Sequence, residues 1–185
     1  MFDFITRFDF SVLYFIQEHI CNPFLDVVSV FLSKAFNGGI AWIVLCALLL
    51  IFRKTRYMGI VAITALALAL LIGELGLKNV ICRPRPCHID PSISLLVKTP
   101  SSYSCPSGHT GSSFAAATAL FLCNKKWGIP ALVMAVIIGL SRMYLFVHFP
   151  TDVLFGAVVG IVGGILAYLI YKKVGLKEKF EKVKQ

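Results

Sequence analysis

Apolar residues dominate the chain from about residue 24 onward, in runs separated by short polar segments. The longest runs reach about 20 residues, the length at which a helix crosses about 30 Å of hydrocarbon. The pattern predicts an all-α integral membrane protein, a six-helix transmembrane bundle. The expected spans are residues 24–36, 40–52, 57–77, 107–123, 128–147 and 151–171, the first of them weak and the second extendable back through Asn37, Gly38 and Gly39.

The first 21 residues follow a different pattern. Phenylalanine and other apolar residues recur at three- and four-residue spacing, with Asp3, Arg7, Asp9 and Glu18 between them. This spacing is typical of an amphipathic helix lying in the membrane interface. No basic region followed by a cleavage site precedes it, so we expect this segment to be retained. The expected organisation is an interfacial helix at 1–21, a membrane domain at 22–173 and a basic tail at 174–185.

Composition and charge fix the environment and orientation. The chain is 58% hydrophobic and 15% charged, with 18 Lys+Arg against 9 Asp+Glu. The cations gather between apolar runs, at 53–56, 125–126 and 172–184, and not on a soluble basic face, which argues against a nucleic-acid partner. The positive-inside rule places these clusters in the cytoplasm. We therefore expect a multi-pass protein of the cell (plasma or inner) membrane, with the loop at 78–106 on the extracytoplasmic side.

Cations on that opposite side need another explanation. Arg142 lies within an apolar run, where a charge costs about 2.5 to 3.5 kcal/mol on insertion scales. It could be an arginine that extends to the interface. With Lys78 and Arg85 on the same side, a clamp for a phosphate group is favoured, because guanidinium forks and an ammonium together suit phosphate oxygens.

A helix start and a histidine pair complete the candidate site. Ser107 precedes a helical run, so the N–H groups of Gly108 and His109 would lie at a positive helix end that suits phosphate, although an ordinary helix start reads the same way. His148 and Asp152 are four residues apart, so the carboxylate could hold one imidazole nitrogen protonated and leave the other nucleophilic. The alternative is an interfacial histidine beside a helix-start aspartate.

His109 is then the remaining histidine in a motif and the candidate general acid. Neither a closely spaced His and Cys set for zinc nor an outer cluster of carboxylates for magnesium occurs in the sequence. We therefore expect a reaction without a metal or other cofactor, in which the cations replace the metal.

Three segments in order resemble the signature of the type 2 phosphatidic acid phosphatases: Lys-x6-Arg-Pro at 78–86, Pro-Ser-Gly-His at 106–109 and Ser-Arg-x5-His-x3-Asp at 141–152. The resemblance implies a metal-independent phosphatase of six helices. It implies that His148 is the nucleophile, supported by Asp152, and that His109 protonates the leaving group. The phosphate-binding residues it implies are Lys78, Arg85, Ser107, Gly108 and Arg142.

The substrate expected from this resemblance is a lipid phosphate or diphosphate, with membrane lipids around the protein. Undecaprenyl diphosphate is favoured because the chain is small and places its site on the side where that carrier is recycled. A phosphatidylglycerophosphate or phosphatidate phosphatase would use the same residues. A non-catalytic protein that binds or transports lipid phosphate would need only the cations. The sequence leaves monomer and homodimer open.

Three further features have two readings each. Cys87 and Cys105 flank the loop on the oxidising side, where a disulfide is plausible, or they are small apolar fillers. Asp90 and Pro91 predict a short helix that could act as a lid or simply pack on the surface. The four-residue repeat of glycine at 156, 160 and 164 predicts close helix packing, inside the bundle rather than in a dimer.

Overall fold

Nearly every apolar run forms a helix, because a helix satisfies its own backbone hydrogen bonds in a medium without water. The computed structural model describes residues 2–175, and this part of the chain contains no β-strand. The α-helices are α1 (Phe2–His19), α2 (Pro23–Ala35), α3 (Ile40–Ile51), α4 (Arg56–Ala69), α5 (Lys78–Ile81), α6 (Pro86–Ile89), α7 (Gly108–Cys123), α8 (Lys125–Tyr144) and α9 (Pro150–Lys173).

The predicted helix boundaries agree with the structure to within a few residues. Helix α8 begins three residues before the predicted 128, because the side chain of Asn124 accepts a hydrogen bond from the N–H of Lys126 at 2.9 Å. The run that begins with α4 continues through a π-helical stretch, η2 (Leu70–Leu77), into α5. This continuous helix ends where Cys82 adopts φ 48°.

The second span extends back through Asn37, Gly38 and Gly39 as expected, but not as α-helix. These residues form a short 3-10 turn, η1 (Asn37–Gly39), in which Gly38 and Gly39 have φ of 58° and 74°. Left-handed backbone is open to glycine and breaks a helix. Helix α2 and the η1–α3 segment are bent by 48° at this break.

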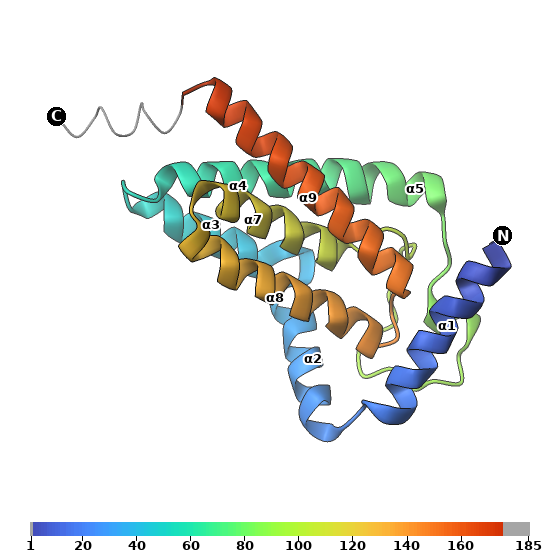
Figure 1. Ribbon diagram of the computed structural model, residues 1–185. Helices are drawn as coiled ribbons and strands as arrows, with labels where there is room; N and C mark the ends of the chain where they lie inside the picture. Colours follow the sequence, from blue (N-terminus) through green and yellow to red (C-terminus); the bar gives the residue numbers. More distant parts are fainter. Residues whose placement is uncertain (1, 176–185) are drawn as a thin grey trace.

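Three helical runs in the described residues are long and apolar enough to cross a membrane, and a fourth is added if the bent pair is one span. These runs are Arg56–Ile89, which includes the short non-helical break at 82–85, Lys125–Tyr144 and Pro150–Lys173. The bent pair is Pro23–Ala35 with Asn37–Ile51. Helix α7 is shorter and lies among α4, α8 and α9, all of which contact it (Figure 1). The protein is thus an all-α, multi-pass membrane protein.

Glycines let α9 approach α7 closely. A Cβ atom added at Gly160 would lie 2.4 Å from the carbonyl oxygen of Gly111, and one at Gly164 would lie 2.7 Å from the Cβ of Thr118. At Gly156 the added atom would lie 2.6 Å from the carbonyl oxygen of Ser107. The predicted packing of the glycine repeat inside the bundle is therefore confirmed.

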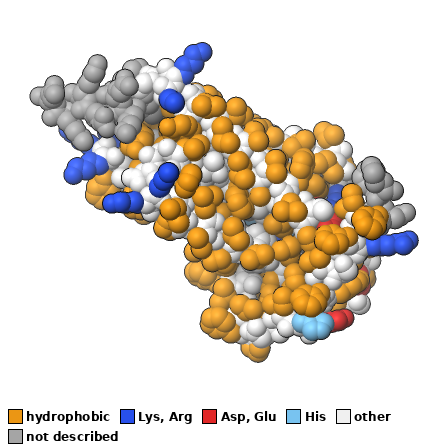
Figure 2. Space-filling view, viewed as in Figure 1, with side chains coloured by type: hydrophobic (Ala, Val, Ile, Leu, Met, Phe, Trp, Pro, Cys, Tyr) orange, Lys and Arg blue, Asp and Glu red, His pale blue; other side chains and the backbone are white. Residues whose placement is uncertain are grey.

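The surface has an apolar middle and a basic end. Figure 2 shows hydrophobic side chains over most of this face, with several Lys and Arg side chains gathered toward the end where α9 ends. The α3–α4 turn, the α7–α8 turn and the end of α9 all lie at this end (Figure 1). The exposed cations there are Arg53, Lys54, Lys125, Lys126, Lys172 and Lys173.

Helix α1 packs on the opposite end of the bundle with one unexpected residue inward (Figure 1). Phe4, Phe8 and Phe15 are exposed, whereas Leu13 and Asp9 are completely buried. The sequence had placed Asp9 on a polar face. Beyond residue 175 the predicted basic tail lies outside the described residues.

Candidate active site

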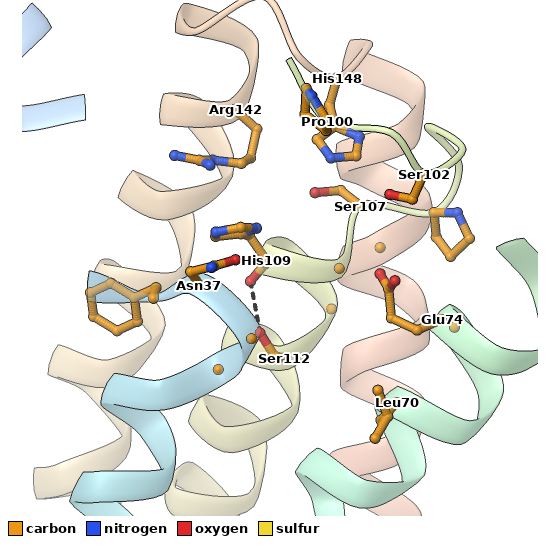
Figure 3. Close-up of a pocket in the computed structure, with 18 of the residues that line it drawn as sticks. Asn37, Leu70, Glu74, Pro100, Ser102, Ser107, His109, Ser112, Arg142 and His148 are labelled. Carbon is orange, nitrogen blue, oxygen red and sulfur yellow. Dashed lines mark hydrogen bonds between the residues drawn. The ribbon is translucent and has the colours of Figure 1, made fainter. Parts of the chain in front are cut away.

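The three polar motifs meet at the end of the bundle away from the basic cluster. Helix α7 begins there, α8 ends there and α9 begins there (Figure 1). A cavity of about 1030 Å³ opens among them, and its wall includes Lys78, Arg85, Ser107, Gly108, His109, Arg142 and His148. Figure 3 shows Ser107, His109 and Arg142 around the same space as His148, with Glu74 on the other side.

Arg142 is a buried cation without a carboxylate partner in the described part of the chain. Its side chain is 2% exposed, and its guanidinium donates to the hydroxyl of Ser33 at 2.9 Å and to the hydroxyl of Ser141 at 3.0 and 3.2 Å. Within residues 2–175 it forms no ion pair. Two serine oxygens orient this charge toward the cavity but do not neutralise it, so an anion in the cavity would meet an uncompensated guanidinium.

Arg85 is held rigidly and contacts His148. Its guanidinium donates to the carbonyl oxygens of Ser102 (2.7 Å), Val147 (2.8 Å) and Tyr103 (3.1 Å). The Nη1 atom of Arg85 also lies 3.0 Å from Nε2 of His148. These contacts tie the proline-flanked segment of the first motif to the turn between α8 and α9.

The contact with Arg85 fixes the protonation of the neutral His148 ring. A guanidinium has only donors, so Nε2 of His148 must accept, and the proton of the neutral imidazole lies on Nδ1. Burial lowers the pKa of His148 to about 3, and the nearby Arg85 charge lowers it too, against the opposing effect of Asp152. His148 is therefore neutral near pH 7, with the lone pair of Nε2 directed at Arg85.

Asp152 faces the other ring nitrogen but at more than hydrogen-bond length. Its Oδ2 atom lies 3.7 Å from Nδ1 of His148, and that Nδ1 is the one buried side-chain polar atom in the described chain without a hydrogen-bond partner. The predicted juxtaposition of the two residues is present. The direct hydrogen bond expected between them is not formed in this state.

A dense shell holds the Asp152 carboxylate instead. Its Oδ2 accepts from the hydroxyl of Ser104 and from the N–H of Phe149, the latter at 2.9 Å. Its Oδ1 accepts from Nη1 of Arg83 at 2.7 Å, and the Arg83 guanidinium also lies 4.0 Å above the ring of Phe149. Asp152 is fully buried, so these donors keep its charge in place beside His148.

Lys78 reaches the cavity from the helix that continues α4. Its ammonium is 2.6 Å from Oε1 of Glu74, one turn earlier in the π-helical stretch. The Glu74 carboxylate also lies over Gly108, where an added Cβ would be 2.0 Å from Oε1. Glycine at this position thus leaves room for an anionic group beside Lys78 and the start of α7.

The start of α7 presents donors to the cavity. Ser107 is the N-cap residue as predicted, but its side chain makes no capping hydrogen bond and accepts from the hydroxyl of Thr110 at 2.9 Å. The first N–H groups of a helix have no hydrogen-bond partner within the helix, so those of α7 are available to a ligand. His109 follows Gly108, and its Nε2 lies 3.1 Å from the carbonyl oxygen of Ser33, so this nitrogen carries a proton.

The disulfide and the helix expected to start at Asp90 are both absent from the described loop. Cys87 and Cys105 are both buried free thiols, so the disulfide is not formed, and burial raises the pKa of Cys105 to about 12, which keeps that thiol protonated. Cys87 packs in an apolar cluster with Leu13 and Phe149, the alternative role. Asp90 does not begin a helix. It is the C-cap residue of the short helix α6, with extended backbone, and its carboxylate accepts hydrogen bonds from Ser92 and from Tyr14 of α1.

Sequence reasoning missed four residues near the site. Ser33 contacts both His109 and Arg142 from the C-terminal end of α2, and Ser104 binds Asp152 from the loop. The two others are Arg83, which binds both Asp152 and Asp9, and Asp9 of α1 itself. In the sequence, Arg83 lies between the motif residues Lys78 and Arg85, and this position could have marked it as a site residue. Nothing in the sequence marks the two serines or Asp9.

Known proteins share this sequence and fold. An undecaprenyl-diphosphatase of Sulfolobus acidocaldarius is 38% identical over 137 residues, which cover 74% of this chain and 66% of the relative's length. The crystal structure of a transmembrane PAP2 type phosphatidylglycerolphosphate phosphatase from Bacillus subtilis has a TM-score of 0.74 at 28% identity, covering 92% of this chain and 87% of that one. The crystal structure of Aquifex aeolicus LpxE has a TM-score of 0.72 at 30% identity and covers 85% and 93%.

The family assignment rests on sequence and structure together. The PAP2 superfamily profile matches residues 57–176, which include every motif described above. The solved relatives share the helical architecture over most of their lengths. The chain therefore belongs to the PAP2 superfamily.

Proposed function

We propose that this protein is a membrane lipid phosphatase that hydrolyses a lipid diphosphate, with undecaprenyl diphosphate as the favoured substrate, through a phosphohistidine intermediate. The observation that carries the proposal is the buried Arg142, which has no carboxylate partner within residues 2–175 and shares one cavity with the neutral imidazole of His148. A buried guanidinium that is not paired with a carboxylate favours binding of an anionic ligand. His148 lies close enough to attack a phosphate bound there. The substrate class is supported by the Sulfolobus relative, whose name is undecaprenyl-diphosphatase.

Phosphate binding would rearrange two contacts. The terminal phosphate accepts hydrogen bonds from Arg142, Arg85 and the N–H groups at the start of α7. The Lys78 ammonium leaves Glu74 and binds the phosphate instead. As the Arg85 fork turns toward phosphate oxygens, Nε2 of His148 is released. Charge on the three equatorial oxygens then faces cations that are already in place, so little reorganisation is needed in the transition state.

Phosphoryl transfer then follows in two steps. The lone pair of His148 Nε2 forms a bond to phosphorus while the bond to the bridging oxygen breaks. His109, which the bound anion favours in its doubly protonated form, gives that oxygen the proton of its Nδ1, while its Nε2–H stays on the carbonyl of Ser33. The proton on Nδ1 of His148 moves into hydrogen-bond range of Asp152, which stabilises the developing positive ring. In the second step water gives a proton to His109 and attacks phosphorus, which releases inorganic phosphate and restores His148.

The runner-up substrate is phosphatidylglycerophosphate or phosphatidate. The likeness to the Bacillus subtilis phosphatidylglycerolphosphate phosphatase supports it, and the same polar residues would serve. The apolar side of the cavity, which includes Ile43, Ile63, Leu66 and Leu70, would then hold a glycerolipid tail. A binding or transport protein is a weaker alternative, because a clamp alone does not need His148 beside Asp152.

We also propose the arrangement in the membrane. The six bundle helices are α2, α3, the run from α4 to α5, α7, α8 and α9. The basic end lies in the cytoplasm and the cavity on the extracytoplasmic side. The exposed cations of the α3–α4 turn, the α7–α8 turn and the end of α9, which lie together at one end of the described chain, support this orientation.

The test is phosphate release by purified protein from undecaprenyl diphosphate, phosphatidylglycerophosphate and phosphatidate in matched micelles. His148→Ala is expected to abolish release, and His88→Ala, which changes an exposed histidine, serves as the control. A rapid quench with labelled substrate should trap an acid-labile phosphoprotein in the wild type alone. Turnover that survives His148→Ala would overturn the mechanism, and activity lost in EDTA and restored by Mg²⁺ would contradict a metal-free site.

A further inference from the structure

Asp9 is a buried carboxylate that the proposed reaction does not use. It lies on α1, between the exposed Phe8 and the partly buried Phe10, and its own side chain is completely buried. An ionised carboxylate in such a place needs charge or hydrogen-bond partners. All of its partners come from the active-site end of the bundle.

These partners form a closed set. Oδ2 of Asp9 accepts from Nη2 of Arg83 at 2.7 Å and from the hydroxyl of Thr151 at 2.5 Å. Its Oδ1 accepts from the N–H of Thr151 at 3.2 Å. The Thr151 hydroxyl in turn accepts from Nη1 of Arg83 at 2.8 Å, and that same Nη1 donates to Asp152.

Arg83 therefore lies between two buried carboxylates. One side of its fork is bound to Asp9 and the other to Asp152, which faces His148. If Asp9 were neutral, the full charge of Arg83 would act on Asp152. The carboxylate would then be drawn away from Nδ1 of His148, and it would stabilise a positive imidazole ring less well.

We propose that Asp9 is a positioning residue for the reaction: through Arg83 and Thr151 it holds the Asp152 carboxylate where it supports His148, so that helix α1 belongs to the catalytic apparatus. This inference rests on the proposed phosphohistidine function. Asp9 does not touch the substrate, and its effect passes through Asp152.

A purely structural role makes a different prediction. If the Asp9–Arg83 pair only attached α1 to the bundle, its removal would lower thermal stability but leave the turnover of folded protein unchanged. If Asp9 positions Asp152, turnover falls while substrate affinity, which depends on the phosphate clamp, is preserved. The two roles therefore separate in kcat and KM.

The experiment is a double-mutant cycle on purified, folded full-length protein. The variants are Asp9→Asn, Asp152→Asn and their combination, with Glu18→Gln as an exposed carboxylate control on the same helix. Asp9→Asn is expected to lower kcat about 10- to 100-fold with little change in KM. In the Asp152→Asn background the same change should alter kcat by no more than about twofold, because the route through Asp152 is already lost.

Each outcome is decisive. Full kcat in Asp9→Asn, or losses that multiply in the double variant, would overturn the inference while leaving the phosphatase proposal intact. Absence of phosphate release by the wild type would instead overturn the proposed function. If Asp9→Asn does not fold, Thr151→Val, which removes the hydroxyl between Asp9 and Arg83, is measured in the same cycle and must show the same non-additive loss.

Discussion

At the scale of single residues, Arg142 shows how an arginine can be prepared for phosphate. Two serine hydroxyls orient its guanidinium, and no carboxylate in the described part of the chain competes for it. A planar fork matches two phosphate oxygens, whereas the ammonium of lysine is a single point of charge. The shape of the cation at this position therefore matters as well as its charge.

Arg142→Lys is expected to lower kcat about 100-fold, because the fork contacts charge that develops in the transition state. Initial rates of phosphate release would measure the loss. Arg53→Lys, an exposed change at the basic end, is the matched control and should keep the wild-type rate. An Arg142→Lys enzyme with normal kcat would show that charge alone is sufficient.

His148 links the site to pH-dependent stability. Its pKa is about 3 in the folded protein, against an ordinary value of 6.5. Between these values the unfolded chain binds a proton that the folded one does not, so stability falls as the pH drops through this range. At pH 5 the loss from this residue is about 2 kcal/mol.

Thermal unfolding in detergent at pH 7 and pH 5 would measure this effect. His148→Gln should destabilise less on acidification than the wild type, and the exposed His88→Gln should behave like the wild type. Parallel losses in wild type and His148→Gln would show that the ring is not held neutral by burial.

Residues of the site differ in how far the sequence reveals them. Arg142 stands out because a charge in an apolar run is costly, and His148 because Asp152 follows at helical spacing. Asp9 and Ser33 give no such signal. Their roles depend on Arg83 and Arg142, which are far away in the chain and meet them only in the folded bundle.

At the scale of helices, the contact between α7 and α9 holds the start of α7 in place. Ser107 donates its N–H to the carbonyl oxygen of Asp152 at 3.1 Å, so the two motifs are joined through backbone as well as side chains. Glycines of α9 allow this close approach. A change in their spacing would shift the N–H groups that face the cavity.

Gly160→Ala should therefore destabilise the protein by about 1 to 3 kcal/mol, because its added methyl group would overlap the Gly111 carbonyl. Gly163→Ala is the matched control on the same helix, since its nearest contact would be an ordinary 3.4 Å. Thermal unfolding midpoints in detergent would compare them. Equal midpoints for the two variants would contradict the close packing.

Helix existence was predictable, but the break at Asn37–Gly39 was not. Periodic apolar runs indicate helices, and two adjacent glycines inside such a run are compatible with either a helix or a turn. Here both glycines are left-handed, and the bend brings the end of α2 against His109 and Arg142. Tertiary contacts select the turn over the helix here, and these contacts cannot be predicted from the local sequence.

At the scale of the whole molecule, the exposed basic residues and the candidate active site lie at opposite ends of the bundle. The short α3–α4 and α7–α8 turns are basic and the cavity lies at the other end of the same helices. The distance between them is set by helices long enough to cross a bilayer. The orientation of the protein therefore decides which leaflet supplies the substrate.

A membrane-impermeant thiol reagent can test the orientation. Cys82 is exposed at the cavity end, so it should be labelled on intact cells, as read by peptide mass spectrometry. A cysteine placed at the basic end by Lys126→Cys should be labelled only after permeabilisation. The reverse pattern would place the site in the cytoplasm.

The pair formed by Glu74 and Lys78 has a consequence for the end of the catalytic cycle. Glu74 already lies beside Lys78 and above Gly108, the space that a phosphate oxygen would take. After hydrolysis, inorganic phosphate competes for Lys78 with a carboxylate tethered one helical turn away, whose local concentration is high. Product inhibition by phosphate should therefore be weak, and the enzyme should keep turning over where free phosphate is abundant.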